Sequence, residues 1–340
     1  MKNTGMNDDI LISARGLSVG FQIGKGMFDK RVLKAVDKVD VDIEAGSFFG
    51  LVGESGSGKT TLGRAFLKAV PITEGGATYN DGEVELDLAT LDGAELKDYR
   101  KRAQLIFQDP YAALSPRMTV RDIIAEPLEV MGLTKSRAET DERVREIAAK
   151  CRLNLEHLRR FPHAFSGGQR QRISIARALV SGPKFVVADE SVAALDVSIQ
   201  ADVLNLLKEL QRDLGITFMF ISHDLSVVAH TCDHVAVMYL GRLVESAPTM
   251  ELFKAPRHPY TKALFSAIPS LDPDDDKSAQ KLEGEIPSPT NQPSGCKFHT
   301  RCPFVVDRCK TEEPKLEHAD GSGHEVSCHR WKELMESHAL

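Results

Sequence analysis

The feature that most constrains this chain is a glycine-rich octapeptide at positions 53–60, Gly-Glu-Ser-Gly-Ser-Gly-Lys-Thr. It matches G-x-x-x-x-G-K-S/T, a pattern whose backbone N–H groups surround phosphate oxygens at the start of a helix. The apolar run at 47–52 predicts a buried strand before it, and 61–70 has helical spacing after it. A surface turn rich in serine and glycine is the alternative, but this context favours a nucleoside triphosphate site.

Each part of the octapeptide has a predicted role. Gly56 and Gly58 let the backbone curl so that successive N–H groups point inward. Lys59 supplies a positive charge for the β- and γ-phosphates, and Thr60 a hydroxyl for Mg²⁺. The predicted ATP-binding segment comprises Gly53, Glu54, Ser55, Gly56, Ser57, Gly58, Lys59, Thr60 and Thr61.

Length and composition narrow the class of protein. A chain of 340 residues is long enough for two domains. Its net charge of −6 argues against a nucleic-acid partner. We find no run of eighteen apolar residues and no secretory signal at the start, so we expect a cytoplasmic protein.

The rest of the pattern predicts an α/β fold. Buried strands are expected at 103–107, 184–188 and 216–221, with helices at 168–180 and 197–214 between them. This alternation favours a mainly parallel core sheet. We further predict an antiparallel β subdomain from strands at 10–17 and 33–41, which flank a flexible loop at 20–30, and a helical subdomain at about 109–182. The ATP-binding domain is expected at 1–268. A linker rich in Asp and Pro then leads into a small C-terminal domain, 269–340.

Two acids end the predicted strand at 184–188. Asp189 at this position can hold Mg²⁺ through water, and Glu190 can orient and deprotonate the attacking water. Gln108 follows another strand, where its amide could reach Mg²⁺ or that water. His223 follows a third strand and could contact the γ-phosphate. For each residue a purely structural role is the alternative.

Ser166, Gly167, Gly168 and Gln169 form a second glycine-rich helix start. Free N–H groups at a helix start make an anion site. Two such sites in one chain make sense if two chains face each other and each completes the other's nucleotide site. The alternative is that Ser166 simply caps the helix.

Taken together, these motifs in this order resemble the ATP-binding subunit of an ABC transporter, over residues 10 to about 265. The resemblance implies Glu190 as general base and His223 as γ-phosphate sensor, with Mg²⁺ served by Thr60, Gln108 and Asp189. It places residues 166–169 against ATP held by the partner ATPase, and Asp196 in a loop that crosses the dimer interface. Phe21 is our choice for stacking on adenine, with Phe28 as runner-up. Ala193 departs from the family's usual serine, which would weaken communication across the dimer.

Three further stretches resemble the oligopeptide/dipeptide importer branch: 108–120 (QDPYAALSPRMTV), 160–163 (RFPH) and 257–264 (RHPYTKAL). This branch implies a second homologous ABC ATPase, two transmembrane permease subunits and an extracytoplasmic solute-binding protein. The chain would sit at the cytoplasmic face of a bacterial inner membrane, with residues 108–131 receiving the permeases' coupling helices. A soluble, non-transport ABC ATPase is the alternative, although such proteins usually carry two ATPase cassettes or a coiled-coil insertion.

Cys296, Cys302, Cys309 and Cys328 form a C-x5-C-x6-C-x18-C pattern in the C-terminal segment. It fits neither the usual zinc spacing nor the bacterial ferredoxin run. A segment with few large apolar residues cannot be stabilised by a hydrophobic core alone, and a four-thiolate metal site would provide a cross-link. The resemblance to the dipeptide branch, including Arg301-Cys302-Pro303, implies a 4Fe–4S cluster; zinc and metal-free thiols stay open.

Basic residues in the same segment are expected to offset thiolate charge: Lys297, Arg301, Arg308 and Arg330. His299, His324 and His329 are expected to lie outside the ligand set. Cys151 and Cys232 occupy helical contexts, where we predict buried apolar side chains.

Overall fold

The computed structural model describes residues 9–23, 31–193, 195–266, 284–319, 321 and 323–337. Phe28 and most of the predicted loop around it lie outside the described residues, as does the whole of the predicted linker at 270–278. The chain divides into two compact units: the first comprises 1–11, 43–48 and 79–221, and the second 12–42, 49–78 and 222–340.

The core of the first unit is a parallel sheet of β6 (Ala103–Ile106), β7 (Phe185–Asp189) and β8 (Thr217–Ile221). β7 pairs with β6 on one side and β8 on the other, in parallel. Every residue of β7 and β8 is buried, as expected for a parallel sheet covered on both faces. The carboxyl ends of these strands therefore meet at one edge, where Asp189 stands opposite Ile221.

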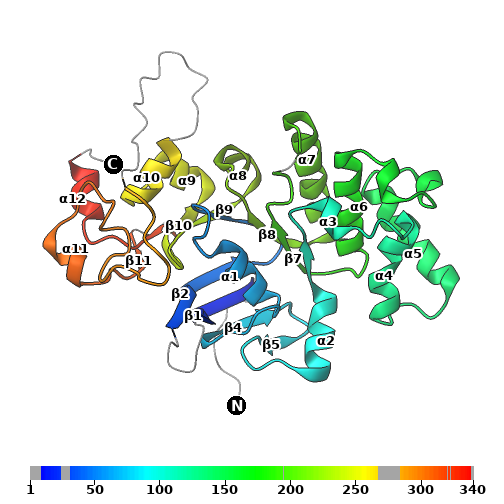
Figure 1. The fold of residues 1–340 in the computed structure, drawn as a ribbon, viewed down its shortest axis with the longest axis horizontal. Coiled ribbons are helices and arrows are strands. Elements are labelled where there is room, and N and C mark those ends of the chain that lie inside the picture. Colours follow the sequence, from blue (N-terminus) through cyan, green and yellow to red (C-terminus); the bar gives the residue numbers. More distant parts are fainter. Residues whose placement is uncertain are drawn as a thin grey trace. The chain divides into compact units, whose positions relative to one another are not determined.

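Helices make up most of the remaining first unit. They are α2 (Gly93–Arg102), α3 (Pro110–Ala113), α4 (Val120–Val130), α5 (Arg137–Lys150), α6 (Gly167–Leu179) and α7 (Val197–Leu214), with β5 (Glu85–Asp87) and 3₁₀ turns η1 (Leu155–His157) and η2 (Pro162–Ala164). α4, α5 and α6 pack together as a helical group (Figure 1). Thr119 and Ser136 begin α4 and α5 as side-chain caps.

The second unit contains most of two sheets. β2 (Arg31–Glu44), β1 (Ile10–Ile23) and β4 (Glu74–Asn80) are neighbours in an antiparallel sheet. β3 (Phe48–Val52) pairs in parallel with β9 (His234–Tyr239), which pairs antiparallel with β10 (Arg242–Pro248). The helices of this unit are α1 (Lys59–Phe66), α8 (Leu225–Thr231), α9 (Thr249–Lys254), α10 (Pro259–Ser266), α11 (Asp307–Thr311) and α12 (Trp331–Glu336).

The C-terminal segment extends the sheet of the second unit. β12 (Glu325–Val326) pairs antiparallel with β10, and β11 (Glu317–His318) pairs with β12. On β10 the fully buried Glu245 accepts the backbone N–H groups of Arg257 and His258 and lies 2.7 Å from Nε2 of His324. A buried carboxylate needs such partners, so this cluster ties the segment to β10.

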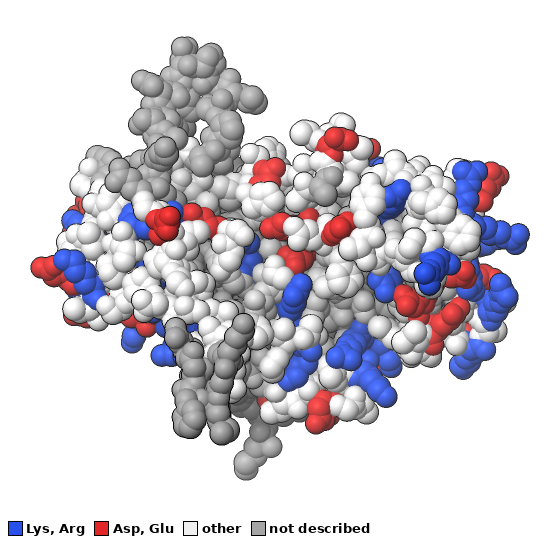
Figure 2. Space-filling view, viewed as in Figure 1, with Lys and Arg blue, Asp and Glu red and all other residues white. Residues whose placement is uncertain are grey.

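The predicted fold class is confirmed: the chain is α/β, with a mixed sheet and an antiparallel sheet. Cys151 and Cys232 are buried as predicted. No helix within the described part of the chain combines the length and apolarity needed to cross a bilayer. On the face shown in Figure 2, basic side chains lie among acidic ones over α4 and α5, so this surface does not have the uniform positive charge of a nucleic-acid interface.

Candidate nucleotide and metal sites

The phosphate loop joins β3 to α1 in the second unit, and close packing fixes its glycines. Gly53 and Gly58 have φ values of 149° and 108°, which disfavour residues with a side chain. A Cβ at Gly53 would lie 2.1 Å from the carbonyl oxygen of Met238, and one at Gly58 would lie 2.3 Å from that of Ala35. At these two positions the loop lies against neighbouring backbone with no room for a side chain.

Lys59 points into the curve of this loop. Its ammonium group is buried and donates to the carbonyl oxygens of Gly53 at 2.8 Å and Glu54 at 2.9 Å. Ser57 Oγ lies 3.4 Å from the same nitrogen. Thr60 and Thr61 follow in the first turn of α1. The arrangement places a cation and a helix start around the same loop, which suits a phosphate group.

Glu54 has two further partners in the second unit that the sequence did not reveal. Both of its carboxylate oxygens accept hydrogen bonds from Arg301, at 2.7 and 3.1 Å. Its backbone N–H donates to the hydroxyl of Tyr260 at 2.9 Å. The guanidinium of Arg301, which the sequence analysis expects to offset thiolate charge, thus has this carboxylate as its hydrogen-bond partner. The hydrogen bond to Glu54 raises the pKa of Arg301 above its ordinary value.

Gln108 and Glu190, which the sequence places after separate strands, come together in the first unit. Nε2 of Gln108 donates to Oε2 of Glu190 at 2.7 Å. Glu190 follows β7 with a φ of 46°, in the left-handed region that costs energy for a residue with a side chain. Its N–H donates to the carbonyl of Ile221 at 2.9 Å. Asp189, the preceding residue, is buried at the end of β7.

Ser166 begins α6 with a reciprocal cap. Its Oγ accepts the N–H of Gln169 at 3.3 Å, and its own N–H donates to Oε1 of Gln169 at 3.0 Å. Both residues therefore have the capping role that the sequence analysis left open. A Cβ at Gly168 would lie 2.5 Å from Cγ2 of Ile199, so only glycine lets α6 approach α7 this closely. Asp196 occupies the exposed N-cap of α7.

The remaining predicted nucleotide residues are in the second unit with the phosphate loop. Phe21 lies on β1 with 36% of its side chain exposed, and His223 is exposed just before α8. Gln108, residues 166–169, Asp189, Glu190 and Asp196 belong to the first unit. The predicted residues therefore form two groups, one in each unit.

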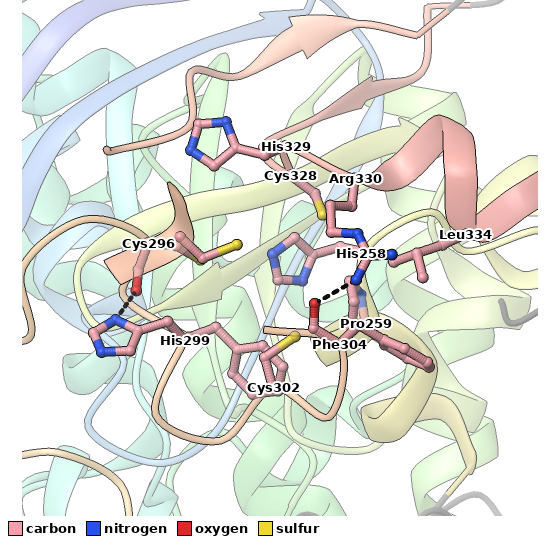
Figure 3. A pocket seen from close by; sticks show the side chains of 12 residues that line it. His258, Pro259, Cys296, His299, Cys302, Phe304, Cys328, His329, Arg330 and Leu334 are labelled. Carbon is pink, nitrogen blue, oxygen red and sulfur yellow. Dashed lines mark hydrogen bonds between the residues drawn. The ribbon is translucent and has the colours of Figure 1, made fainter. Parts of the chain in front are cut away.

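The four C-terminal cysteines line one cavity of about 20 Å³ in the second unit (Figure 3). In Figure 3 the sulfur atoms of Cys296, Cys302 and Cys328 point toward the cavity from different loops. The N–H of Cys296 donates to the carbonyl of Cys309 at 2.8 Å, which ties two of these loops together. Within the described ranges, no group of three or more His, Cys, Asp or Glu side chains is arranged so that it could hold a metal ion.

The cysteine cavity is largely shielded from water. Burial raises the pKa of Cys296 to about 11 and that of Cys328 to about 12, and it also raises the pKa of Cys302. Such thiols stay protonated at neutral pH unless a metal displaces the proton. The four thiols therefore line one cavity, but their sulfur atoms are not arranged around a common metal position.

The basic and histidine residues near the cysteines have separate partners. Arg330 lines the cavity and donates to the carbonyl of Phe304 at 3.0 Å. Arg308 instead pairs with Glu312 on the surface, and Lys297 donates to the carbonyl of Pro293. Of the three histidines, His299 and His329 line the cavity, whereas His324 is buried against Glu245.

A groove of about 300 Å³ lies in the first unit between β6, α4 and α6. Phe107 and Val130 line it, and these residues are 43% and 79% exposed. Arg177 and Glu126 form an ion pair at 2.8 Å in its wall. An apolar groove with one fixed ion pair is suited to a short helix of another protein.

Comparisons with known proteins agree with this architecture. Residues 36–193 match the family described as ABC transporter, and residues 244–309 match the oligopeptide/dipeptide transporter C-terminal region. A Brucella ovis protein, provisionally named a peptide import ATP-binding protein, is 50% identical, with 96% of this chain and 99% of that protein covered. The dipeptide transport ATP-binding protein DppF of Escherichia coli is 46% identical, with 94% of this chain and 93% of that protein covered.

A solved structure shows the same fold. It is the dimeric post-hydrolysis state of the ATP-binding cassette MJ0796, bound to ADP and phosphate. It is 25% identical to this chain, with a TM-score of 0.61, and the match covers 70% of this chain and 99% of that one.

Proposed function

Because the chain belongs to the ABC transporter family, in the group that carries the oligopeptide/dipeptide transporter C-terminal region, we propose that it is the ATP-hydrolysing subunit of a peptide importer. Its ATP binding and hydrolysis would drive transport of dipeptides, oligopeptides or related solutes. The observation that carries this proposal is the hydrogen bond between Gln108 and Glu190 at the end of β7, in a chain that also has an intact phosphate loop.

The proposed hydrolysis assigns a task to each group of residues. Lys59 and the loop N–H groups bind the phosphates, while Thr60, Gln108 and Asp189 hold Mg²⁺. Glu190 takes the proton of the attacking water, and Gln108 keeps its carboxylate in place. His223 contacts the γ-phosphate, and Phe21 stacks on adenine. Asp196 and residues 166–169 complete the ATP site of a partner subunit, an arrangement that the dimeric MJ0796 structure supports by analogy.

The groove between β6, α4 and α6 supports the proposed membrane partner. Its exposed apolar residues and its ion pair suit a short cytoplasmic helix of a permease subunit. We propose an assembly with two such permeases, a second homologous ATPase and an extracytoplasmic solute-binding protein. The chain would then work at the cytoplasmic face of a bacterial inner membrane.

We also propose that the four C-terminal cysteines hold a 4Fe–4S cluster. What supports this proposal is that all four cysteines line one cavity, although they come from separate positions in the segment. Because the cavity has room for about one water molecule, the loops would move apart around a cluster. When bound, the cluster would link four loops of the segment. A colourless anaerobic preparation with zinc and no iron would contradict this assignment.

Transport tests the main proposal. The chain is expressed with its companion subunits, reconstituted in proteoliposomes and supplied with ATP and labelled di- and oligopeptides. We expect ATP-dependent peptide uptake, and loss of both nucleotide binding and uptake in Lys59→Met. The matched control is Lys208→Met, which removes a lysine from α7 outside the phosphate loop. ATP turnover without uptake of any peptide would favour the soluble, non-transport ATPase instead.

A further inference from the structure

Glu54 of the phosphate loop is fixed by three side chains that come from different parts of the second unit. Arg301 of the C-terminal segment binds its carboxylate, and Tyr260 of α10 accepts its backbone N–H. Lys59 donates to its carbonyl oxygen. The side chain, the N–H and the carbonyl of one residue are therefore all held, which defines the path of the loop at this point.

One of these three contacts is expected to break when a nucleotide binds. Lys59 has the charge that attracts phosphate, and an ammonium group that turns toward phosphate gives up carbonyl partners. The contact from Arg301 does not compete with phosphate in this way, because it reaches Glu54 through its carboxylate. The Tyr260 hydroxyl takes the N–H of Glu54, so phosphate is left to the other N–H groups of the loop. These two side chains would then hold Glu54 in the nucleotide-bound state.

Arg301 is itself firmly placed. Its side chain is 5% exposed, and its guanidinium lies 5.9 Å from the ring centroid of Tyr239. Its N–H donates to the carbonyl of Phe298, whose ring packs at 5.4 Å against both Tyr239 and Tyr260. All three rings are buried. The next residue along the chain is Cys302, so the fold of the cysteine segment determines where the guanidinium lies.

We propose that Arg301 and Tyr260 are positioning residues for nucleotide binding, which hold the phosphate loop through Glu54 and so make ATP affinity depend on the C-terminal segment. The proposal rests on the proposed function, since it requires that the loop binds ATP. Both residues contact the loop at Glu54. Their removal should therefore weaken binding and raise KM, while kcat stays close to its original value.

The first test removes each contact from the full-length chain. Arg301→Met keeps much of the side-chain volume, and we expect the Kd for a fluorescent ATP analogue with Mg²⁺ to rise about tenfold, since hydrogen bonds to charged groups are strong. Tyr260→Phe keeps the buried ring and removes one hydroxyl, so a rise of about threefold is expected. Arg15→Met, which removes a surface arginine paired with Asp42, is the control and should leave Kd unchanged.

The second test asks whether Arg301 acts through Glu54. We expect Glu54→Gln alone to weaken binding about as much as Arg301→Met, and the double variant to be no worse than either. In the assembled transporter the same variants should raise KM and keep kcat within about twofold. A lower Tm with unchanged Kd would overturn the proposal, as would fully additive losses. A wild-type chain that binds no ATP analogue would instead contradict the proposed function itself.

Discussion

Two glutamates, one in each unit, are held in contrasting ways. Glu54 has ordinary backbone geometry, and a buried guanidinium binds both of its carboxylate oxygens. Glu190 has a left-handed backbone, and its carboxylate receives the neutral amide of Gln108. A charge-assisted bidentate pair is stronger than a bond to an amide. The comparison indicates that Glu54 is an anchor, whereas Glu190 keeps a carboxylate that can exchange its partner for water.

The largest expected effect concerns the region of Glu190, in the first unit. Glu190→Gln removes the proposed base, so we expect kcat for ATP hydrolysis by the assembled transporter to fall at least about 100-fold. The Kd for ATP should stay within a few-fold, because the phosphate loop is intact. The control is Glu209→Gln, a change of the same chemistry at an exposed position paired with Arg152. Full turnover in Glu190→Gln would remove this residue as the base.

Gln108→Ala tests how much the hydrogen bond from Gln108 supports the role of Glu190. Without the amide, the Glu190 carboxylate loses a hydrogen bond of 2.7 Å, and we expect kcat to fall by about 10-fold to 100-fold. Gln211→Ala removes an amide that binds the carbonyl of Gly46 elsewhere in the first unit and serves as the control. A steady-state assay that showed only a raised KM would assign Gln108 to ATP binding alone.

Metal removal from the proposed cysteine site tests the Glu54 region. If the segment places Arg301, stripping the metal should weaken binding of the fluorescent ATP analogue by about threefold in the wild-type chain. Arg301→Met should show little further change, because the contact is already lost. Fluorescence titrations before and after chelation, with iron analysis, measure this. An equal loss of affinity in the wild-type chain and in Arg301→Met would mean that the metal affects ATP binding without acting through Arg301.

The smallest expected effect is a pH dependence of stability in the second unit. Burial alone would raise the pKa of Asp37, but its hydrogen bonds with Arg242 outweigh this and lower the pKa from its ordinary value of 3.8. The ion pair between Asp37 and Arg242 therefore stabilises the folded state above about pH 4. This contribution to the free energy of unfolding is lost as the pH falls through the lowered pKa of Asp37. Urea unfolding from pH 6 to pH 3 should show less loss in Asp37→Asn than in the wild-type chain. An equal pH dependence in the two proteins would show that the Asp37–Arg242 pair does not contribute to the free energy of unfolding.

Local sequence patterns predicted most of the motifs and long elements of this protein. The features that they did not predict depend on contacts between residues far apart in the sequence. The phosphate loop, β7 and α7 follow from local patterns whose residues act through adjacent backbone. The bond between Arg301 and Glu54 joins residues 247 positions apart and leaves no periodic signal. β11 and β12 have two residues each, too short for an alternating pattern. Tyr260 lies within a recognised stretch, 257–264, but nothing there indicates the phosphate loop as its partner.

The pairing of β12 with β10 has a practical consequence for anyone who shortens this protein. A chain that stops at residue 266 would leave one side of β10 without its partner strand, and unpaired strand edges promote self-association. The same cut would deprive Glu245 of His324, one of its buried partners. We therefore expect such a fragment to precipitate on expression, even though it retains every residue of the phosphate loop.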